Sequence, residues 1–182
     1  SDTSIDVVVY RAPSPNFTIN QQCEGEVISP INTTNAYGTS IIEYLWTVEE
    51  IGTFNTENPT WVFNNQGSYD VTLQVANTAW CTRDTTIKQL IFQKPTALFE
   101  VNPEIGISPL IINTDNQSEN AVNFTWEVDA NFESNEIEPT ITIVNDGVHE
   151  ISLIAENNFN CLDTAIKNVV VGEANLDIEL LD

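Results

Sequence analysis

The sequence predicts an all-β protein built from two tandem antiparallel β-sandwiches. Hydrophobic and polar residues alternate along short segments, most of this pattern occurs twice, and no segment shows a helical period of useful length. The chain has 182 residues, 41% of them hydrophobic, which is enough for one large core or two small ones. With about seven short strands expected in each repeat, a two-sheet sandwich is the fold that this pattern favours.

The repeat is clearest in an alternating, glycine-led strand at residues 67–77, which recurs at residues 147–157. The two copies align without a gap over a long stretch, at a spacing of 80 residues. The pairs that define this spacing are Trp46 and Trp126, Pro59 and Pro139, Gly67 and Gly147, Asn77 and Asn157, and Cys81 and Cys161. Upstream the spacing varies, and there the matches are Phe17 with Phe99 and Ser29-Pro30 with Ser108-Pro109. A period of this length predicts a tandem array of similar modules.

Prolines mark the boundaries between the modules. Pro13-Ser14-Pro15 and Lys94-Pro95-Thr96 each end one strand and set the entry to the next. We therefore expect a first domain at residues 13–93 and a second at residues 95–172.

Both ends of the chain lie outside these two domains. Residues 1–11 match the closing strands at residues 84–92 and 163–171, so we expect them to be the last strand of a preceding repeat. Residues 173–182 alternate as a strand and match the opening of neither repeat, so we interpret them as the start of a different downstream module.

One tryptophan in each repeat is expected to lie in the centre of its core. Two strands carry apolar residues at every second position, which predicts that one face of each strand is buried. The residues of this face are Ile42, Tyr44, Trp46 and Val48 in the first repeat and Val122, Phe124, Trp126 and Val128 in the second.

This pattern resembles that of PKD domains, an immunoglobulin-like module. The resemblance lies in the tryptophan of the third strand, in Asn58-Pro59-Thr60-Trp61-Val62-Phe63, and in the alternating run that starts at Gly67. Cys81 before Asp84-Thr85, and Cys161 before Asp163-Thr164, resemble the variant found in tandem in giant cell-surface adhesins of gliding Bacteroidota. The resemblance covers about residues 13–172. It implies immunoglobulin-like, PKD-type sandwiches on an extracellular, cell-surface protein.

The single histidine is expected to be structural. His149 occupies the position of Tyr69 in the first repeat, and the resemblance implies that a tyrosine there packs at a strand corner and donates a hydrogen bond to the backbone. We therefore expect Trp46, Trp126, Tyr69 and His149 to be core residues. No serine or cysteine has a histidine and a carboxylate placed in a recognisable pattern, and there is no phosphate-binding glycine loop. The sequence therefore predicts a protein that is not an enzyme.

Charge excludes one class of partner. Only 5 lysines and arginines stand against 27 acidic residues, which gives a formal charge of −22. Such a surface repels polyanions, so we expect no nucleic-acid partner. No apolar run approaches the roughly 18 residues that a membrane-spanning helix needs, so no direct membrane insertion is expected.

Three cysteines in an acidic, all-β chain favour disulfides over metal binding or catalysis. Cys23 falls in the turn between the first two strands and Cys81 in the hairpin between the last two. In an immunoglobulin-like sandwich these turns lie at opposite ends, roughly 25 Å apart, whereas a disulfide tolerates only about 7 Å between Cα atoms. Stacking the domains end to end would place Cys23 near Cys161. We therefore predict an inter-domain disulfide between Cys23 and Cys161, and we expect Cys81 to pair with a preceding repeat.

Glycosylation of threonine is also suggested by the sequence. Thr3, Thr85 and Thr164 each follow an aspartate, in triplets that resemble the O-glycosylation sequon of exported Bacteroidota proteins. The alternative interpretation is a turn that enters a strand. Asn-x-Ser/Thr triplets begin at Asn16, Asn32, Asn116 and Asn123.

Calcium is the one cofactor that the residues suggest. Four acidic side chains follow the second tryptophan strand and offer oxygen ligands, which suit calcium. They are Asp129, Glu133, Glu136 and Glu138. The alternative is an acidic loop exposed to solvent.

The predicted function is mechanical and non-catalytic. We expect a stalk segment of a large secreted cell-surface adhesin, with surface adhesion or gliding motility as the context that the resemblance implies. Its partners would be neighbouring repeats of the same chain, and further candidates are extracellular glycans and outer-membrane secretion or motility machinery. The alternative is an accessory module that binds polysaccharide or protein substrates beside a secreted enzyme. Exposed aromatic residues would favour that alternative, and Trp80 is the best candidate.

Overall fold

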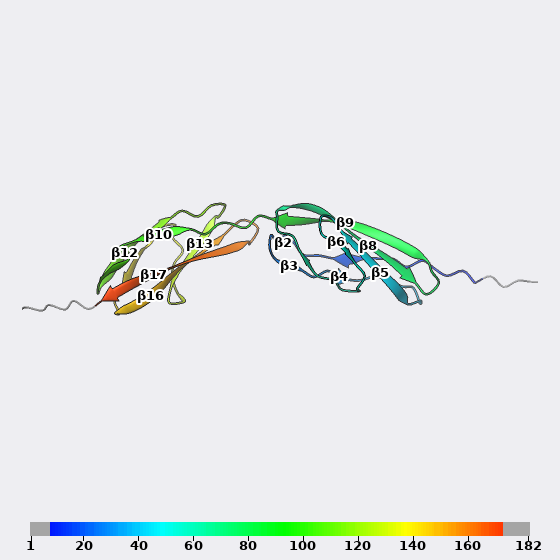
Figure 1. The fold of residues 1–182 in the computed structure, drawn as a ribbon, viewed down its shortest axis with the longest axis horizontal. Helices are drawn as coiled ribbons and strands as arrows, with labels where there is room; N and C mark the ends of the chain where they lie inside the picture. Colours follow the sequence, from blue (N-terminus) through cyan, green and yellow to red (C-terminus); the bar gives the residue numbers. More distant parts are fainter. Residues whose placement is uncertain (1–7, 173–182) are drawn as a thin grey trace, which may run out of the picture. The chain divides into compact units, whose positions relative to one another are not determined.

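A computed structural model describes residues 8–172 of the chain, and it contains strands, turns and loops without a helix in that range (Figure 1). The all-β fold that the sequence predicts is confirmed. The chain divides into two compact units, Ser1–Gln93 and Lys94–Asp182. Thr3 and residues 173–182 lie outside the described residues, and residues 8–11 of the first segment form no strand.

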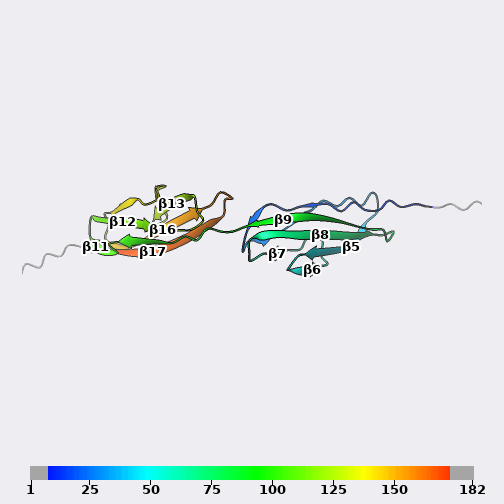
Figure 2. The same cartoon turned by 90° about the horizontal axis from the view of Figure 1, so that it is seen from above.

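Unit 1 is a sandwich whose larger layer is a five-stranded sheet. Its order is β2 (Gln22–Cys23), β9 (Thr82–Phe92), β8 (Gly67–Asn77), β5 (Ile41–Val48) and β6 (Gly52–Phe54). The other layer consists of two short pairs, β1 (Phe17–Thr18) with β4 (Ile31–Asn32) and β3 (Val27–Ile28) with β7 (Trp61–Val62). The long β8–β9 hairpin runs the length of the unit, and β6 is a short strand beside β5 (Figure 2).

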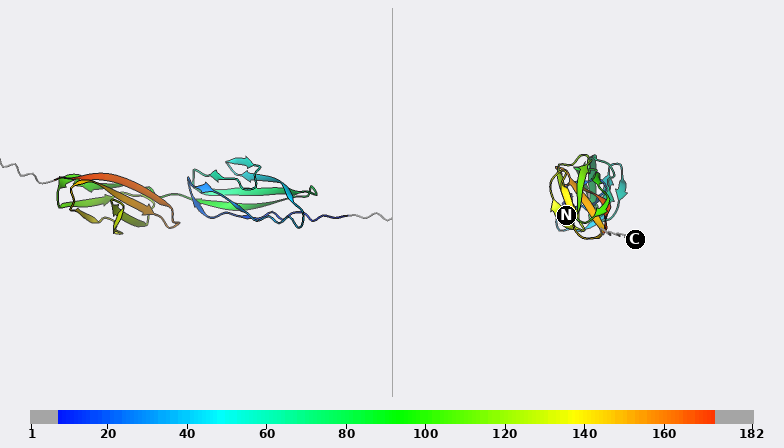
Figure 3. Two further views of the ribbon diagram at one scale, coloured as in Figure 1. Left: turned by 90° about the horizontal axis from the view of Figure 1, so that it is seen from below. Right: turned by 90° about the vertical axis from the view of Figure 1, so that its left-hand side faces the viewer.

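Unit 2 has the same architecture with a more continuous second layer. Its five-stranded sheet has the order β11 (Ile105–Ile107), β17 (Leu162–Gly172), β16 (Gly147–Glu156), β13 (Asn123–Val128) and β14 (Asn131–Ser134). The opposing sheet is β10 (Phe99–Asn102), β12 (Leu110–Asn116) and β15 (Thr140–Ile143). The long closing strand β17 is drawn in orange to red in Figure 3.

A buried tryptophan joins the two layers of each unit. Trp46 in β5 meets the edge of Phe17 in β1, with ring centroids 4.8 Å apart, and Trp126 in β13 meets Phe99 in β10 at 5.0 Å. Both tryptophans are fully buried. Their indole N–H groups donate to backbone carbonyls ten residues further on, at 3.1 Å in unit 1 and 3.0 Å in unit 2. The core tryptophans therefore lie where the sequence predicts. The apolar surface of each ring is buried, and its single N–H group has a hydrogen-bond acceptor.

The predicted alternation fails at the start of the tryptophan strand. The pairing of β5 with β8 is irregular between Ile41 and Glu43, and this bulge turns Ile42 outward, so that 42% of it is exposed. Ile41 packs against the core in its place. Val122 precedes β13 and is also exposed. The prediction that Ile42 and Val122 are buried is therefore wrong. At Ile42 a bulged residue reverses the faces of the strand, and Val122 lies in a bend before its strand begins.

The match of Ser29-Pro30 with Ser108-Pro109 is also wrong. Phe17 pairs with Asn32 and Phe99 with Asn116, so the structural equivalents of Ser29 and Pro30 are Asn113 and Thr114 inside β12. Proline has no N–H to offer to a neighbouring strand, so the continuous strand of unit 2 becomes two short strands, β3 and β4, in unit 1.

The closing strands are shifted by one residue relative to the alignment that their sequences suggest. Asp70 pairs with Lys88, and its equivalent Glu150 pairs with Asn168 rather than with Lys167. A shift of one residue moves every side chain to the opposite face. Lys88 therefore projects to solvent and binds Asp70, whereas Lys167 turns inward and binds Glu100 of β10.

Substitution of Trp126 by alanine should destabilise unit 2 by about 3–5 kcal/mol and leave unit 1 folded, because the two buried clusters share no residue. Urea unfolding followed residue by residue by NMR would measure this, with the unit 1 variant Trp46→Ala as the mirror experiment. Trp80→Ala, at a side chain that is 72% exposed, is the neutral control. Equal loss of stability in both units would contradict the prediction.

Candidate functional site

The hairpin between β8 and β9 is organised by one buried asparagine. Asn77 is fully buried, and its side-chain oxygen accepts hydrogen bonds from the amides of Ala79 and Cys81 at 3.1 and 3.0 Å. Its side-chain nitrogen donates to the carbonyl of Arg11, on the segment that enters the unit. One residue therefore fixes the position of Cys81 and attaches the incoming chain to the hairpin.

Unit 2 repeats this arrangement between β16 and β17. The side-chain oxygen of Asn157 accepts from the amides of Phe159 and Cys161, at 2.9 and 3.1 Å. The two hairpins thus present their cysteines in the same local geometry. The 80-residue spacing of Asn77 and Asn157 can be seen in the sequence. Their role in positioning the cysteines cannot, because in sequence an asparagine that caps this hairpin looks the same as one at any other turn.

Cys23 lies at the other end of unit 1. It is the last residue of β2, which runs parallel to β9, and it pairs with Phe92 at the end of that strand. The amide of Glu24 donates to the Phe92 carbonyl at 2.9 Å. The equivalent residue of unit 2 is Ile107, which pairs with Gly172, so this turn has no cysteine in unit 2. Cys23 and Cys161 are disulfide-bonded, and Cys81 is a free thiol.

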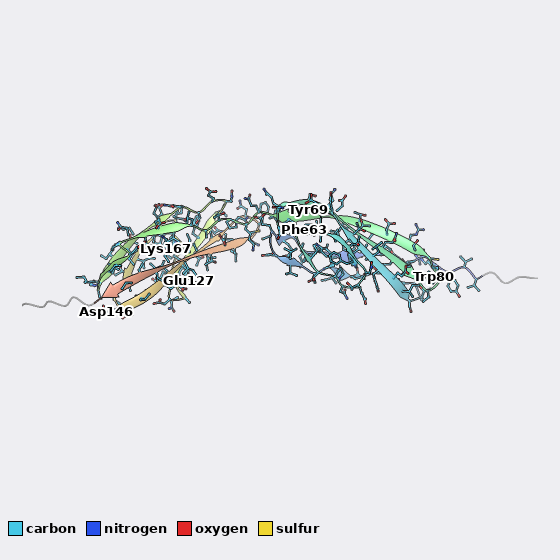
Figure 4. The ribbon with its side chains drawn as sticks, in the orientation of Figure 1. Phe63, Tyr69, Trp80, Glu127, Asp146 and Lys167 are labelled. Atoms are coloured by element: carbon cyan, nitrogen blue, oxygen red, sulfur yellow. The ribbon has the colours of Figure 1, made fainter. Side chains whose placement is uncertain are left out.

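A tyrosine holds the corner at the start of β8. The Tyr69 hydroxyl donates to the carbonyl of Asn65 at 3.0 Å, and its ring stacks on Phe63 at 4.0 Å (Figure 4). A Cβ atom on Gly67 would lie 2.9 Å from the Tyr69 ring, which explains the glycine at the start of this strand. Tyr69 and its neighbours therefore form a packed corner.

His149 holds the same corner in unit 2. Its Nε2 lies 2.9 Å from the carbonyl of Asn145, as the Tyr69 hydroxyl does from Asn65, and its Nδ1 lies 2.8 Å from the Asp129 carboxylate. Asp129 also accepts a hydrogen bond from the amide of Glu150. Both ring nitrogens face acceptors, so the arrangement favours the doubly protonated imidazolium. A ring with both nitrogens occupied has none free to act as a general base.

Electrostatics reinforce this ion pair. The hydrogen bond to Asp129 raises the pKa of His149, and burial opposes that rise only in part. The same hydrogen bond, together with the Glu150 amide, lowers the pKa of Asp129. Each partner thus stabilises the charged form of the other.

The four acidic residues suggested for calcium do not form a cluster. Asp129 binds His149, Glu133 lies in β14, and Glu136 and Glu138 lie in the loop that follows. Within residues 8–172, no group of three or more metal-binding side chains lies close enough to hold an ion. The sequence shows their proximity along the chain, but the folded chain does not bring three of them together.

The threonines suggested for glycosylation differ in exposure. Thr164 is exposed, whereas Thr85 is half-buried on the inward side of β9, as a result of the one-residue shift between the closing strands. Two of the four sequon asparagines are equivalent in the structure, Asn32 and Asn116. Each accepts a hydrogen bond from the amide two residues on, at 3.0 Å, and so ends its strand with a turn.

Comparison with protein-family models gives no match, and comparison with curated proteins gives none either. Solved structures with similar folds are found. The PKD1 domain of the Vibrio cholerae metalloprotease PrtV is 27% identical, with a TM-score of 0.41 over 45% of this chain and 99% of that domain. Fibronectin(III)-like modules of Clostridium thermocellum CbhA are 16% identical, with a TM-score of 0.48 over 92% of this chain and 100% of that one.

A C-terminal fragment of intimin, solved in complex with the intimin-binding domain of its translocated receptor, has a TM-score of 0.50 at 12% identity. It covers 86% of this chain and 64% of the fragment. At this level of identity the likeness concerns the fold. Together with the strand order, it shows that the chain has an immunoglobulin-like β-sandwich fold.

The His149–Asp129 pair should make the stability of unit 2 depend on pH. The folded-state pKa of His149 is raised above its ordinary value of 6.5, so the contribution is fully present below that pH and is lost as the pH rises through the folded-state pKa. At the acid end the contribution of Asp129, whose pKa is lowered from 3.8, is lost as the pH falls through its own folded-state value. Urea unfolding of unit 2 measured from about pH 6 to about pH 9 should therefore show declining stability.

The control is His149→Tyr, which installs the residue of unit 1 at the same corner. It should retain the bond to the Asn145 carbonyl and abolish the decline with rising pH. An unchanged pH profile in this variant would show that another group titrates. The stability of unit 1, which has Tyr69 at this position, should not change over the same range.

Proposed function

We propose that the chain is a non-catalytic structural segment of an extracellular, cell-surface protein, a stalk whose modules are joined by disulfides as well as by the backbone. The observation that carries this proposal is the pattern of its three cysteines. Cys81 and Cys161 occupy equivalent hairpins, Cys23 occupies the opposite turn of unit 1, and Cys23 and Cys161 are disulfide-bonded. We propose that these two are bonded to each other.

Contacts inside each unit support that pairing. In unit 1, Cys23 pairs with Phe92, the last residue of β9 before the linker. In unit 2, the amide of Ala97, just after the linker, donates to the Asp163 carboxylate at 2.8 Å, two residues from Cys161. Five residues of chain span at most about 17 Å. Each cysteine is therefore attached, within its own unit, close to one end of the same short linker. This favours a bond between these two cysteines.

An extracellular setting fits the chemistry. Disulfides persist in oxidising compartments, whereas they are rare in the cytosol. The charge of −22 keeps a long surface protein soluble. Among the residues that the structure describes, none forms a helix able to span a bilayer. Adhesion or gliding motility, as the context of the stalk, rests on the resemblance to tandem adhesin modules.

The absence of a catalytic role is part of the proposal. The one histidine of the chain has both ring nitrogens engaged, and its ion pair replaces the packing of a tyrosine in the other unit. The chemistry available to residues 8–172 is therefore thiol chemistry and surface binding.

Force measurement tests the bridge directly. In the oxidised protein pulled from its two ends, a Cys23–Cys161 bond shields the residues between the two cysteines, so they should not extend. Adding reductant should release about 500 Å of further contour length, since roughly 140 residues extend by about 3.6 Å each.

Cys81→Ser should leave this result unchanged, whereas Cys23→Ser should release the whole length without reductant. Non-reducing peptide mapping provides an independent check and should show a Cys23–Cys161 peptide with Cys81 labelled by a thiol reagent. A Cys23–Cys81 peptide, or equal extension with and without reductant, would contradict the bridge.

One observation favours a second function, the binding of polysaccharide or protein substrate beside a secreted enzyme. Trp80 is 72% exposed at the tip of the β8–β9 hairpin, and an exposed indole is a common platform for a sugar ring. Glycan-array binding that is lost in Trp80→Ala and retained in the cysteine variants would support this function over the stalk. Absence of glycan binding by the wild-type protein would contradict this second function.

A further inference from the structure

Strand β5 has an open edge in unit 1. On one side it pairs with β8 along its length, but on the other side β6 pairs only with Trp46, Thr47 and Val48. Residues 41–45 therefore have a strand neighbour on one side only. An edge strand presents backbone N–H and C=O groups that another strand can pair with.

A groove of 380 Å³ lies over residues 42–45 of β5 and reaches across β8 as far as Thr82 of β9. Leu45 and Glu43 lie opposite Gln74 and Ala76 on the outer face of the sheet, and Tyr44 and Asn55 line the groove from the other side of the edge. One end of the groove thus borders the free edge, beyond Phe54, where β6 ends.

The lining of the groove combines exposed aliphatic side chains with polar ones and one carboxylate, that of Glu43. Ile42 and Leu45 are 42% and 37% exposed, because the bulge in β5 turns Ile42 outward. Burial raises the pKa of Tyr44, and the neighbouring Glu57 carboxylate raises it further by its charge and a hydrogen bond. Neither Glu43 nor Glu57 takes part in the ion pairs that we find within residues 8–172.

Unit 2 has an equivalent groove with different chemistry. It measures 340 Å³ and follows the edge of β13, where Asn123 and Thr125 replace Glu43 and Leu45. There the Thr125 hydroxyl donates to the Asn135 side chain and the Asn123 amide to Glu156, both at 3.3 Å. In this second groove the polar side chains of Asn123 and Thr125 already have side-chain partners, and the aliphatic lining is Val122 and Ile137 in place of a leucine.

We propose that the groove along β5 binds an extended peptide segment of another protein, with lysine or arginine at alternate positions, which adds to the free edge as a further strand. The peptide backbone would pair with residues 41–45. The aliphatic stems of its basic side chains would pack on Ile42 and Leu45, and their charged ends would reach Glu43 and Glu57.

Charge complementarity selects this occupant. The chain has 27 acidic and 5 basic residues and a charge of −22, so a basic segment is attracted and an acidic one repelled. Those 5 basic residues form no alternating run, so residues 1–182 do not themselves supply such a strand. This surface is separate from the cysteines, and its binding is independent of the stalk proposal.

The test uses the full chain labelled with ¹⁵N and a peptide of ten residues in which lysine and valine alternate. We expect its addition to shift the amide signals of residues 41–45 and to leave those of residues 123–125 in place. Two matched peptides serve as controls. One has glutamate in place of lysine, and the other is N-methylated at alternate residues, which keeps the charge and removes the backbone donors on one edge.

An exchange of residues between the two grooves supplies the variants. Glu43→Asn with Leu45→Thr gives unit 1 the residues of unit 2 and should weaken peptide binding at least tenfold. Asn123→Glu with Thr125→Leu does the reverse and should create peptide binding on unit 2. All four positions lie on the outer face or at the edge of a sheet, and a urea unfolding curve of each variant checks that the fold is retained.

Three outcomes would overturn the proposal. Equal binding of the N-methylated peptide would show general charge attraction rather than strand addition. Binding that survives the Glu43→Asn and Leu45→Thr exchange would place the peptide elsewhere. A response of the groove amides to a neutral oligosaccharide, with none to the lysine–valine peptide, would assign the groove to carbohydrate instead.

Discussion

The contact between one tryptophan and the opposite sheet is the constraint on which each unit depends. The ring of Trp46 or Trp126 fills the space between the layers and meets the edge of a phenylalanine. Its only polar atom is satisfied by a carbonyl of the loop after the edge strand β6 or β14. A smaller residue would leave a cavity and an unpaired carbonyl together. The ring therefore sets the separation of the sheets and also anchors the loop that limits how far the edge strand can extend along its neighbour.

With the core of each unit fixed by its tryptophan, the two ends of the glycine-led strand, β8 or β16, have different structural roles. At its start, a side chain must donate to a carbonyl four residues earlier, and a tyrosine does this in unit 1 and a histidine in unit 2. The histidine adds a charge and therefore needs Asp129, which places an ion pair where unit 1 has a stacked aromatic pair. At its end, Asn77 or Asn157 closes a hairpin that presents a cysteine. One strand thus connects a purely structural corner to the position of the thiol chemistry.

The sequence predicts the fold and the core well because the repeat runs without a gap from Trp46 to Cys81, so that spacing alone identifies equivalent positions. It fails where equivalence depends on backbone pairing. The closing strands look aligned by Ile87 with Ile166 and Lys88 with Lys167, yet the structure offsets them by one residue, and Ile166 is 55% exposed while Ile87 packs against the core. The predictions for Ile42 and for Ser29-Pro30 fail for the same reason, because a bulge in β5 and the proline that divides β3 from β4 change which backbone positions pair. For the candidate sites, sequence finds the cysteines by type but not the β5 groove, because an open edge is defined by where its neighbour stops.

The two units differ at their surfaces as well as in their cores, and the open edge of β5 shows why the surface differences matter. An unpaired edge invites pairing with a second copy of the same chain, and proteins prevent this by placing charge along the edge. Here Glu43 lies on that edge, and the whole chain is strongly acidic, so two copies repel each other. The same charge that prevents self-association favours a basic strand, since it alone gains both the backbone pairing and the neutralisation of Glu43. Protection of the edge and choice of its partner are therefore two consequences of one acidic surface.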